Sequence, residues 1–207
     1  MNQNKQAPIG VFDSGVGGLT VAREIMRNLP SERIVYFGDT ARVPYGSKSK
    51  EIVLKYSRQI VRFLQTQEVK AIVVACNTAS AMALETIREE IDIPIIGVVK
   101  PGAKVAARTT RNKKIGLIGT RGTVNSELYP AIIHEYDPRI QVIGQACPLL
   151  VPLVEEGWLK DEVTVEVTKR YLDPLLEQGV DTLILGCTHY PLLRSLMRQV
   201  AGESVTL

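Results

Sequence analysis

The chain has 207 residues, 45% of them hydrophobic and 23% charged, a balance that is ordinary for a globular protein with a sizeable core. Lys and Arg total 25 against 22 Asp and Glu, a net charge of +3, so we expect neither a nucleic-acid partner nor binding to a membrane surface. Residues 1–8 lack the apolar core of a signal peptide, and apolar runs such as 71–75 are far shorter than a membrane-spanning helix.

Short apolar runs alternate with longer amphipathic stretches along the chain. The short runs are typical of buried strands, which we expect at 9–12, 34–37, 71–75, 95–99, 115–118, 140–143 and 182–185. Helical spacing predicts helices at 19–29, 50–65, 79–91 and 163–176, with Pro174 bending or ending the last. Strands that alternate with helices predict an α/β fold with largely parallel sheets and right-handed crossovers.

A break in this pattern follows the fourth predicted strand, where Pro101 and Gly102 stand together. Such a pair is typical of a turn or linker. We therefore expect one α/β domain at 1–98 and a second at 99–207.

The three cysteines include no CxxC pair, so they fit neither a disulfide framework nor a zinc site. We expect a cytoplasmic protein with reduced thiols and no metal. Cys147 precedes a proline and an apolar stretch, and we assign it to packing.

The other two cysteines occupy matching contexts in the two predicted domains. Cys76 stands in Ala-Cys-Asn-Thr and Cys187 in Gly-Cys-Thr-His, each between a buried strand and a helical segment. Ligands of parallel α/β sheets bind beyond the carboxyl ends of strands, and a helix N-terminus favours thiolate over thiol. We therefore expect both thiols to titrate near neutrality, suited to removing a proton from one face of a carbon and delivering one to the other.

Packing is the alternative for each thiol, because free Cys is among the most buried residue types. The matching context of two turns makes packing alone a poor explanation for Cys76 and Cys187. A redox pair is also a poor explanation, because the two thiols are far apart in the sequence.

A glycine-rich loop with Gly15, Gly17 and Gly18 follows the first predicted strand, and glycine lets backbone N–H groups approach a ligand closely. The spacing is not GxGxxG, so dinucleotide binding is a weak interpretation. Asp13, just before the loop, suits contact with a substrate ammonium or a thiol. Its alternative is a turn residue that pairs with local N–H groups.

Several nearby side chains have two interpretations each. Tyr45 either covers the site or caps the core. His189 either exchanges protons with the second cysteine or is a partly exposed helix cap. The polar side chains of Asn77, Thr78 and Thr188 either cap helices or bind a carboxylate, and both uses can coexist.

These motifs also carry a resemblance to a known family. The sequence resembles glutamate racemases, bacterial enzymes that supply D-glutamate for peptidoglycan. The matching segments run in the family's order over nearly the whole chain: 13–18 (DSGVGG), 38–40 (GDT), 44–46 (PYG), 75–79 (ACNTA), 118–120 (IGT), 146–152 (ACPLLVP) and 186–191 (GCTHYP). The first and last segments point to the glutamate branch rather than the aspartate or hydantoin branches.

The resemblance implies two pseudo-symmetric domains with the active site in the cleft between them, and racemisation without a cofactor or metal. It assigns Cys76 and Cys187 as the acid–base thiols, assisted by Asp13 and His189. Contacts to glutamate are implied at Asp13, Ser14, Tyr45, Gly46, Asn77, Thr78, Thr120, Thr188 and His189, with Thr123 as a further carboxylate contact. Family members continue past the position of Leu207 and return to the first domain, so domain 1–98 is expected to lack that segment.

Other functions stay open at this point. They are an aspartate racemase, a phosphate- or nucleotide-binding module built on the glycine loop and on Gly119-Thr120, and a chain that binds substrate or a partner without turnover. A homodimer is also open, and Trp158 is assigned to packing or to a subunit contact.

Overall fold

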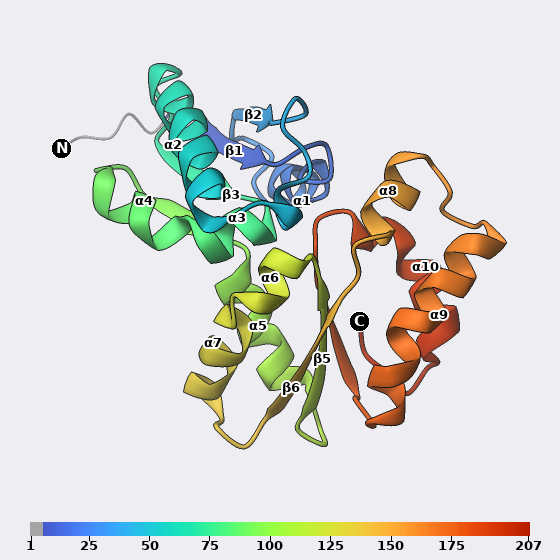
Figure 1. The fold of residues 1–207 in the computed structure, drawn as a ribbon. Coiled ribbons are helices and arrows are strands. Elements are labelled where there is room, and N and C mark those ends of the chain that lie inside the picture. Colours follow the sequence, from blue (N-terminus) through green and yellow to red (C-terminus); the bar gives the residue numbers. More distant parts are fainter. Residues whose placement is uncertain (1–5) are drawn as a thin grey trace. The chain divides into compact units, whose positions relative to one another are not determined.

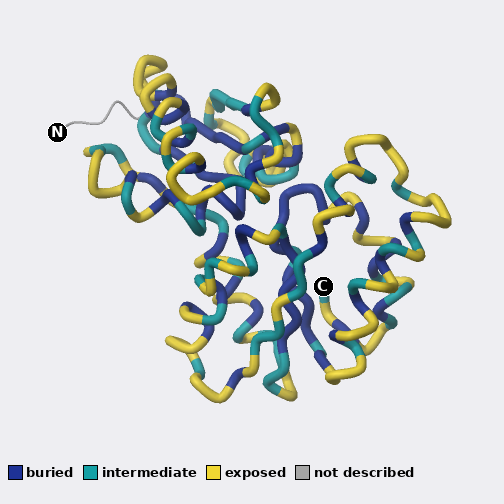
Figure 2. Tube along the Cα trace, in the orientation of Figure 1, coloured by how far each residue is buried: buried dark blue, intermediate teal, exposed yellow. Residues whose placement is uncertain are grey.

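The computed structural model describes residues 6–207, and the chain divides into two compact units, Met1–Val98 and Val99–Leu207. Each unit is a parallel sheet with helices on both faces (Figure 1). In both, the central strands are buried and the outer helix faces are exposed (Figure 2). The predicted α/β class with parallel sheets is confirmed.

The first unit is a four-stranded sheet in the order β2-β1-β3-β4, with every pair parallel. Helix α1 packs on one face of this sheet, and α2, α3 and α4 pack on the other. The elements are β1 (Ile9–Asp13), α1 (Leu19–Asn28), β2 (Ile34–Gly38), the 3-10 helix η1 (Tyr45–Ser47), α2 (Lys50–Thr66), β3 (Ala71–Val74), α3 (Asn77–Met82), α4 (Leu84–Glu90) and β4 (Ile95–Gly97).

The second unit is a three-stranded parallel sheet in the order β6-β5-β7. Helices α5 and α7 pack on one face, and α8, α9 and α10 on the other. The elements are α5 (Val99–Thr109), β5 (Lys114–Gly119), α6 (Arg121–Asn125), α7 (Leu128–Tyr136), β6 (Gln141–Ala146), α8 (Leu150–Glu155), α9 (Glu162–Glu177), β7 (Thr182–Gly186), the 3-10 helix η2 (Tyr190–Leu193) and α10 (Arg194–Ala201).

All seven predicted strands are present, with shifted ends. The expected burial on both faces holds for the central strands β1 and β5. It is wrong for the edge strands β2, β4 and β6, which are partly exposed. The predicted strand 95–99 is too long, because Val99 already begins α5.

Two helix predictions and the predicted break at Pro101 need correction. The single helix expected at 79–91 is two helices, because Ala83 leaves helical geometry (φ −123°, ψ −24°). Helix α9 runs through Pro174 to Glu177; Pro174 is exposed, so water can bind the carbonyl that its missing N–H leaves unpaired. Pro101 does not interrupt the fold either, because it lies in the first turn of α5, where no intrahelical N–H bond is needed.

Within residues 6–207, no helix combines the length and apolarity needed to cross a bilayer. The same residues contain no group of three or more His, Cys, Asp or Glu side chains arranged to hold a metal ion. Part of the predicted polar N-terminal stretch, residues 1–5, lies outside the described residues.

Asp181 fastens the turn between α5 and β5 to the start of β7. Its carboxylate accepts hydrogen bonds of 2.7 Å from Thr110 Oγ1, Arg111 N and Asn112 N, and one of 2.9 Å from Thr182 Oγ1. Burial alone would raise the pKa of Asp181, but the hydrogen bonds to its charged form outweigh burial and hold the pKa below its usual value.

We expect Asp181→Asn to lower the free energy of unfolding by about 1–3 kcal/mol, because an amide offers one acceptor oxygen where the carboxylate offers two. The folded-state pKa lies below the unfolded one, so the wild-type contribution is present above about pH 4 and is lost as pH falls through the folded-state pKa. Urea denaturation at neutral and acidic pH measures both effects. Asp173→Asn, at an exposed position of α9, is the control. If Asp181→Asn had the same free energy of unfolding as the wild type at neutral pH, the prediction would be contradicted.

Candidate active site

In each unit, the polar turns predicted from the sequence follow the two strands between which the chain order reverses. In the first unit that point lies between β1 and β3, and in the second between β5 and β7. Such a switch point opens a crevice at the carboxyl edge of a parallel sheet. Strand register places Phe12 beside Val74 and Gly119 beside Gly186, so the turns that follow each pair of strands start at the same edge.

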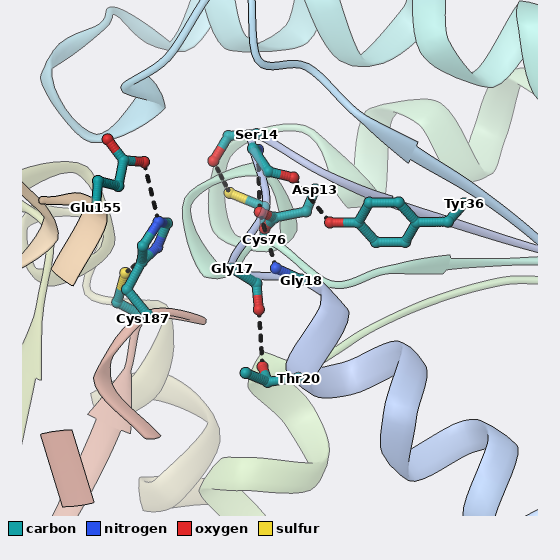
Figure 3. Close-up of polar contacts among 11 residues, drawn as sticks. Asp13, Ser14, Gly17, Gly18, Thr20, Tyr36, Cys76, Glu155 and Cys187 are labelled. Carbon is teal, nitrogen blue, oxygen red and sulfur yellow. Dashed lines mark hydrogen bonds and ion pairs between the residues drawn. The ribbon is translucent and has the colours of Figure 1, made fainter. Parts of the chain in front are cut away.

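Cys76 lies between β3 and α3 and is the N-cap residue of α3. Its Sγ donates to Ser14 Oγ at 3.5 Å and accepts from Ala79 N at 3.4 Å, so sulfur caps the helix (Figure 3). Asn77 and Thr78 are therefore not the capping residues; they form the first turn of α3 and are buried. The thiol itself is buried, with 5% of the residue exposed.

The expected near-neutral titration of Cys76 is wrong. Burial raises the pKa of the thiol to about 11, and the negative charge of Asp13 adds to the increase. Hydrogen bonds from Ala79 and Ser14 favour the thiolate but are too weak to offset burial. Cys76 is accordingly a thiol at neutral pH.

Asp13 organises the glycine loop. One carboxylate oxygen, Oδ2, accepts from Gly15 N at 3.0 Å and Gly18 N at 3.1 Å, and Tyr36 OH donates to Gly15 O at 2.8 Å. A Cβ on Gly18 would lie 2.4 Å from Asp13 Cβ, so only glycine fits there. The turn-residue interpretation of Asp13 is confirmed, and the same buried carboxylate acts electrostatically on Cys76.

Tyr45 belongs to the core of the first unit, with 1% of the residue exposed. Its hydroxyl donates to the buried carboxylate of Asp39, which also accepts from Arg42 Nε at 2.9 Å. Burial, followed by the bond to Asp39, raises the pKa of Tyr45. The buried ring therefore anchors η1 to the core of the first unit. The adjacent Gly46 is half-buried.

Cys187 lies beside an imidazole that is itself held by a carboxylate. Cys187 Sγ is 3.7 Å from His189 Nδ1, and His189 Nε2 is 3.1 Å from Glu155 Oε1. Figure 3 shows the Glu155 side chain directed at this ring. The alternative interpretation of His189 as a partly exposed helix cap is wrong, because only 4% of the residue is exposed.

This arrangement selects one imidazole tautomer. An ionised carboxylate can only accept, so the proton of neutral His189 lies on Nε2, facing Glu155. Nδ1 then presents its lone pair to the Cys187 thiol. The three groups form a path along which a proton can leave the sulfur while Glu155 stabilises the imidazolium.

The sequence predicts that an α-helix follows Cys187 directly, and this prediction is wrong. Pro191 falls in the first turn of the 3-10 helix η2, which precedes α10. Thr188, before this turn, is buried. At the end of β5, Thr120 Oγ1 accepts from Thr123 N at 3.1 Å and caps α6. Capping was predicted for Asn77, Thr78 and Thr188, and this cap at Thr120 was not predicted.

Two carboxylates near the predicted site residues were not predicted. Asp39 directly follows β2 at the same edge as Asp13, and its position after an apolar strand was a usable signal. Glu155 ends α8, 34 residues before His189. No rule of sequence spacing links Glu155 to His189, so only the tertiary structure brings these two residues together.

The family model described as Asp/Glu/Hydantoin racemase matches residues 9–206. The chain belongs to this family. It is 54% identical over 199 residues to a glutamate racemase of Geobacter metallireducens, covering 96% of this chain and 74% of the relative.

Solved structures give the same relationship. A glutamate racemase of Francisella tularensis in complex with D-glutamate matches with a TM-score of 0.91 and 41% identity, covering 98% of this chain and 75% of that one. One from Escherichia coli, in complex with L-glutamate and the activator UDP-MurNAc-Ala, matches with a TM-score of 0.82 and 37% identity, covering 97% and 77%. The predicted relationship to glutamate racemases and the predicted enzyme class, an amino-acid racemase, are confirmed. The nucleotide-binding and redox alternatives are set aside.

We expect Asp13→Asn to lower the pKa of Cys76 below its value of about 11, because a neutral amide removes the charge that opposes the thiolate while one oxygen still accepts from the loop. The rate of Cys76 alkylation against pH, followed peptide by peptide by mass spectrometry, measures the shift. Cys147, whose pKa burial raises to about 12, is the internal control. If the pH midpoint of Cys76 alkylation is unchanged or higher in Asp13→Asn, the electrostatic role of Asp13 is refuted.

Proposed function

We propose that the chain interconverts L- and D-glutamate by a two-base mechanism without a cofactor, with Cys76 and Cys187 acting on opposite faces of the α-carbon. The observation that carries this proposal is the equivalence of the two cysteine turns. Each thiol follows a strand at the switch point of its own sheet, and each has its own neighbouring group that responds to charge on sulfur.

The two thiols have different neighbours, and we assign their resting roles from these. His189, held by Glu155, accepts the proton of Cys187, which then acts as the base. Cys76, whose thiolate is disfavoured by burial and Asp13, is the acid.

Racemisation then moves one proton on each face of the substrate. The Cys187 thiolate takes the α-proton and becomes a thiol, and the carbanion takes the proton of Cys76, which becomes a thiolate. After the product leaves, solvent returns a proton to Cys76. The His189 imidazolium releases its proton to solvent, and the neutral ring can then accept the proton of Cys187 again. In the opposite direction the two thiols exchange roles.

Glutamate supplies two carboxylates and an ammonium for recognition. We assign the ammonium to Asp13 and Ser14, and the carboxylates to backbone and hydroxyl donors at the polar turns: Tyr45, Gly46, Asn77, Thr78, Thr120, Thr123 and Thr188. Donors fixed before the substrate arrives stabilise the carboxylate charge that grows as the α-proton leaves. Complexes of relatives with D-glutamate and with L-glutamate support this choice of substrate.

We further propose that the product serves peptidoglycan synthesis in the cytoplasm, and that the chain acts as a homodimer. Support for the first comes from the activator named for the Escherichia coli relative, which contains the peptidoglycan sugar N-acetylmuramic acid. The homodimer stays a prediction that sedimentation analysis can test.

Cys76→Ala and Cys187→Ala are each expected to lower racemisation by about 10²–10⁴-fold, the usual contribution of a positioned acid or base. Enantiomers have equal free energy, so kcat/KM must fall equally in both directions. Circular dichroism from pure L- and pure D-glutamate measures both. Cys147→Ala removes a thiol that donates to Gln145 O, and it is the control expected to keep nearly full activity.

Deuterium exchange separates the two roles. In D2O, each single-thiol variant is expected to exchange the α-proton of one enantiomer without inversion, and the two variants to act on opposite enantiomers. Full racemisation by either variant, or exchange of the same enantiomer by both, would contradict the two-base scheme.

A further inference from the structure

The turn that carries Cys187 and His189 is fastened to the segment that carries Glu155 by a buried tyrosine. Tyr190 has no exposed surface, and its hydroxyl donates to Cys147 O at 3.0 Å. Cys147 stands just before α8, whose last residue is Glu155. The bond therefore joins the two segments that supply the two ends of the His189–Glu155 contact.

Packing reinforces this connection. The Tyr190 ring lies in the same buried cluster as Cys147, Leu150 and Val154. Leu150 and Val154 are the buried residues of α8, and Val154 immediately precedes Glu155. The tyrosine thus contacts the core cluster on which α8 rests, while its backbone N donates to Cys187 O at 3.1 Å.

The Cys147 carbonyl, which accepts the hydrogen bond from Tyr190, is also held in place. Cys147 N donates to Gly119 O at 2.8 Å, which ties the start of the α8 segment to the end of β5. Cys147 O accepts from Leu150 N at 3.2 Å as well as from Tyr190. Because burial raises the pKa of Tyr190, its hydroxyl stays protonated and remains a donor at any pH at which the protein functions.

We propose that Tyr190 is a positioning residue for racemisation: by holding the start of α8 against the 187–190 turn, it keeps the Glu155 carboxylate at hydrogen-bond distance from His189. This inference rests on the proposed function, because it assigns Tyr190 a role through the His189–Glu155 pair. Glu155 is 37% exposed and lies at the end of a six-residue helix, so its position depends on what anchors that helix.

The test compares Tyr190→Phe, Glu155→Gln and the double variant. Tyr190→Phe keeps the ring in the core and leaves Cys147 O with Leu150 N as a donor, so the protein is expected to fold. We expect kcat to fall roughly tenfold, as a catalytic group is misplaced, and kcat/KM to fall by the same factor in the two directions, because the enantiomers have equal free energy. In the double variant, kcat is expected to equal that of Glu155→Gln alone, since both changes act through one contact.

Tyr129→Phe is the matched control. It removes the hydroxyl of another buried tyrosine of the same unit, in the separate cluster beside α5, and is expected to change thermal stability without changing kcat. A general loss of stability would affect both variants alike, whereas the proposed role affects only Tyr190→Phe.

Nuclear magnetic resonance of the His189 ring gives a readout that does not depend on activity. The Nε2–H signal is expected to lose its hydrogen-bonded shift in Tyr190→Phe and to keep it in Tyr129→Phe. An unchanged His189 signal, or losses of kcat that add in the double variant, would overturn the role of Tyr190. Wild-type racemisation by Cys187→Ala would instead overturn the proposed function, while the His189 signal would still decide whether Tyr190 positions Glu155.

Discussion

Parallel strand pairing in fixed register is the constraint on which both polar sites depend. A thiol reaches the carboxyl edge of its sheet only because Phe12 pairs with Val74 in one unit and Gly119 with Gly186 in the other. A slip of one residue would turn every side chain of a strand to the opposite face, and the buried apolar strands β1 and β5 oppose such a slip. Close approach also matters: a Cβ on Gly186 would lie 2.7 Å from Ile118 O, so the residue before Cys187 must be glycine.

The strand order β6-β5-β7 of the second unit repeats the order β2-β1-β3 of the first, but the two thiols have different surroundings. Cys76 lies beside a carboxylate that opposes its ionisation, whereas Cys187 lies beside an imidazole that can accept its proton. A racemase must act on mirror-image substrates with an asymmetric protein, so identical surroundings for the two thiols are not required. What the chemistry requires is that each thiol can lose and regain a proton, and the two neighbourhoods achieve this by different means.

Much of this organisation was predictable from local sequence, and the reasons for the exceptions are physical. The strands and the cysteine turns follow from apolar runs that end in polar residues, a signal that tertiary contacts rarely override. The break at Ala83 and the passage of α9 through Pro174 depend on backbone geometry and solvent access, which periodicity does not encode. The pairing of Glu155 with His189 depends on how α8 packs beside η2, and the raised pKa of Cys76 depends on the depth of burial; neither is visible in a motif.

The burial of Cys76 also bears on how the protein withstands oxidants. Peroxides react with thiolates far faster than with thiols, and a sulfur whose pKa is raised to about 11 carries almost no thiolate at neutral pH. Burial also limits access to this sulfur, since only 5% of the residue is exposed. The Cys76 sulfur, which the proposed mechanism uses for proton transfer, is thereby kept in its less reactive thiol form.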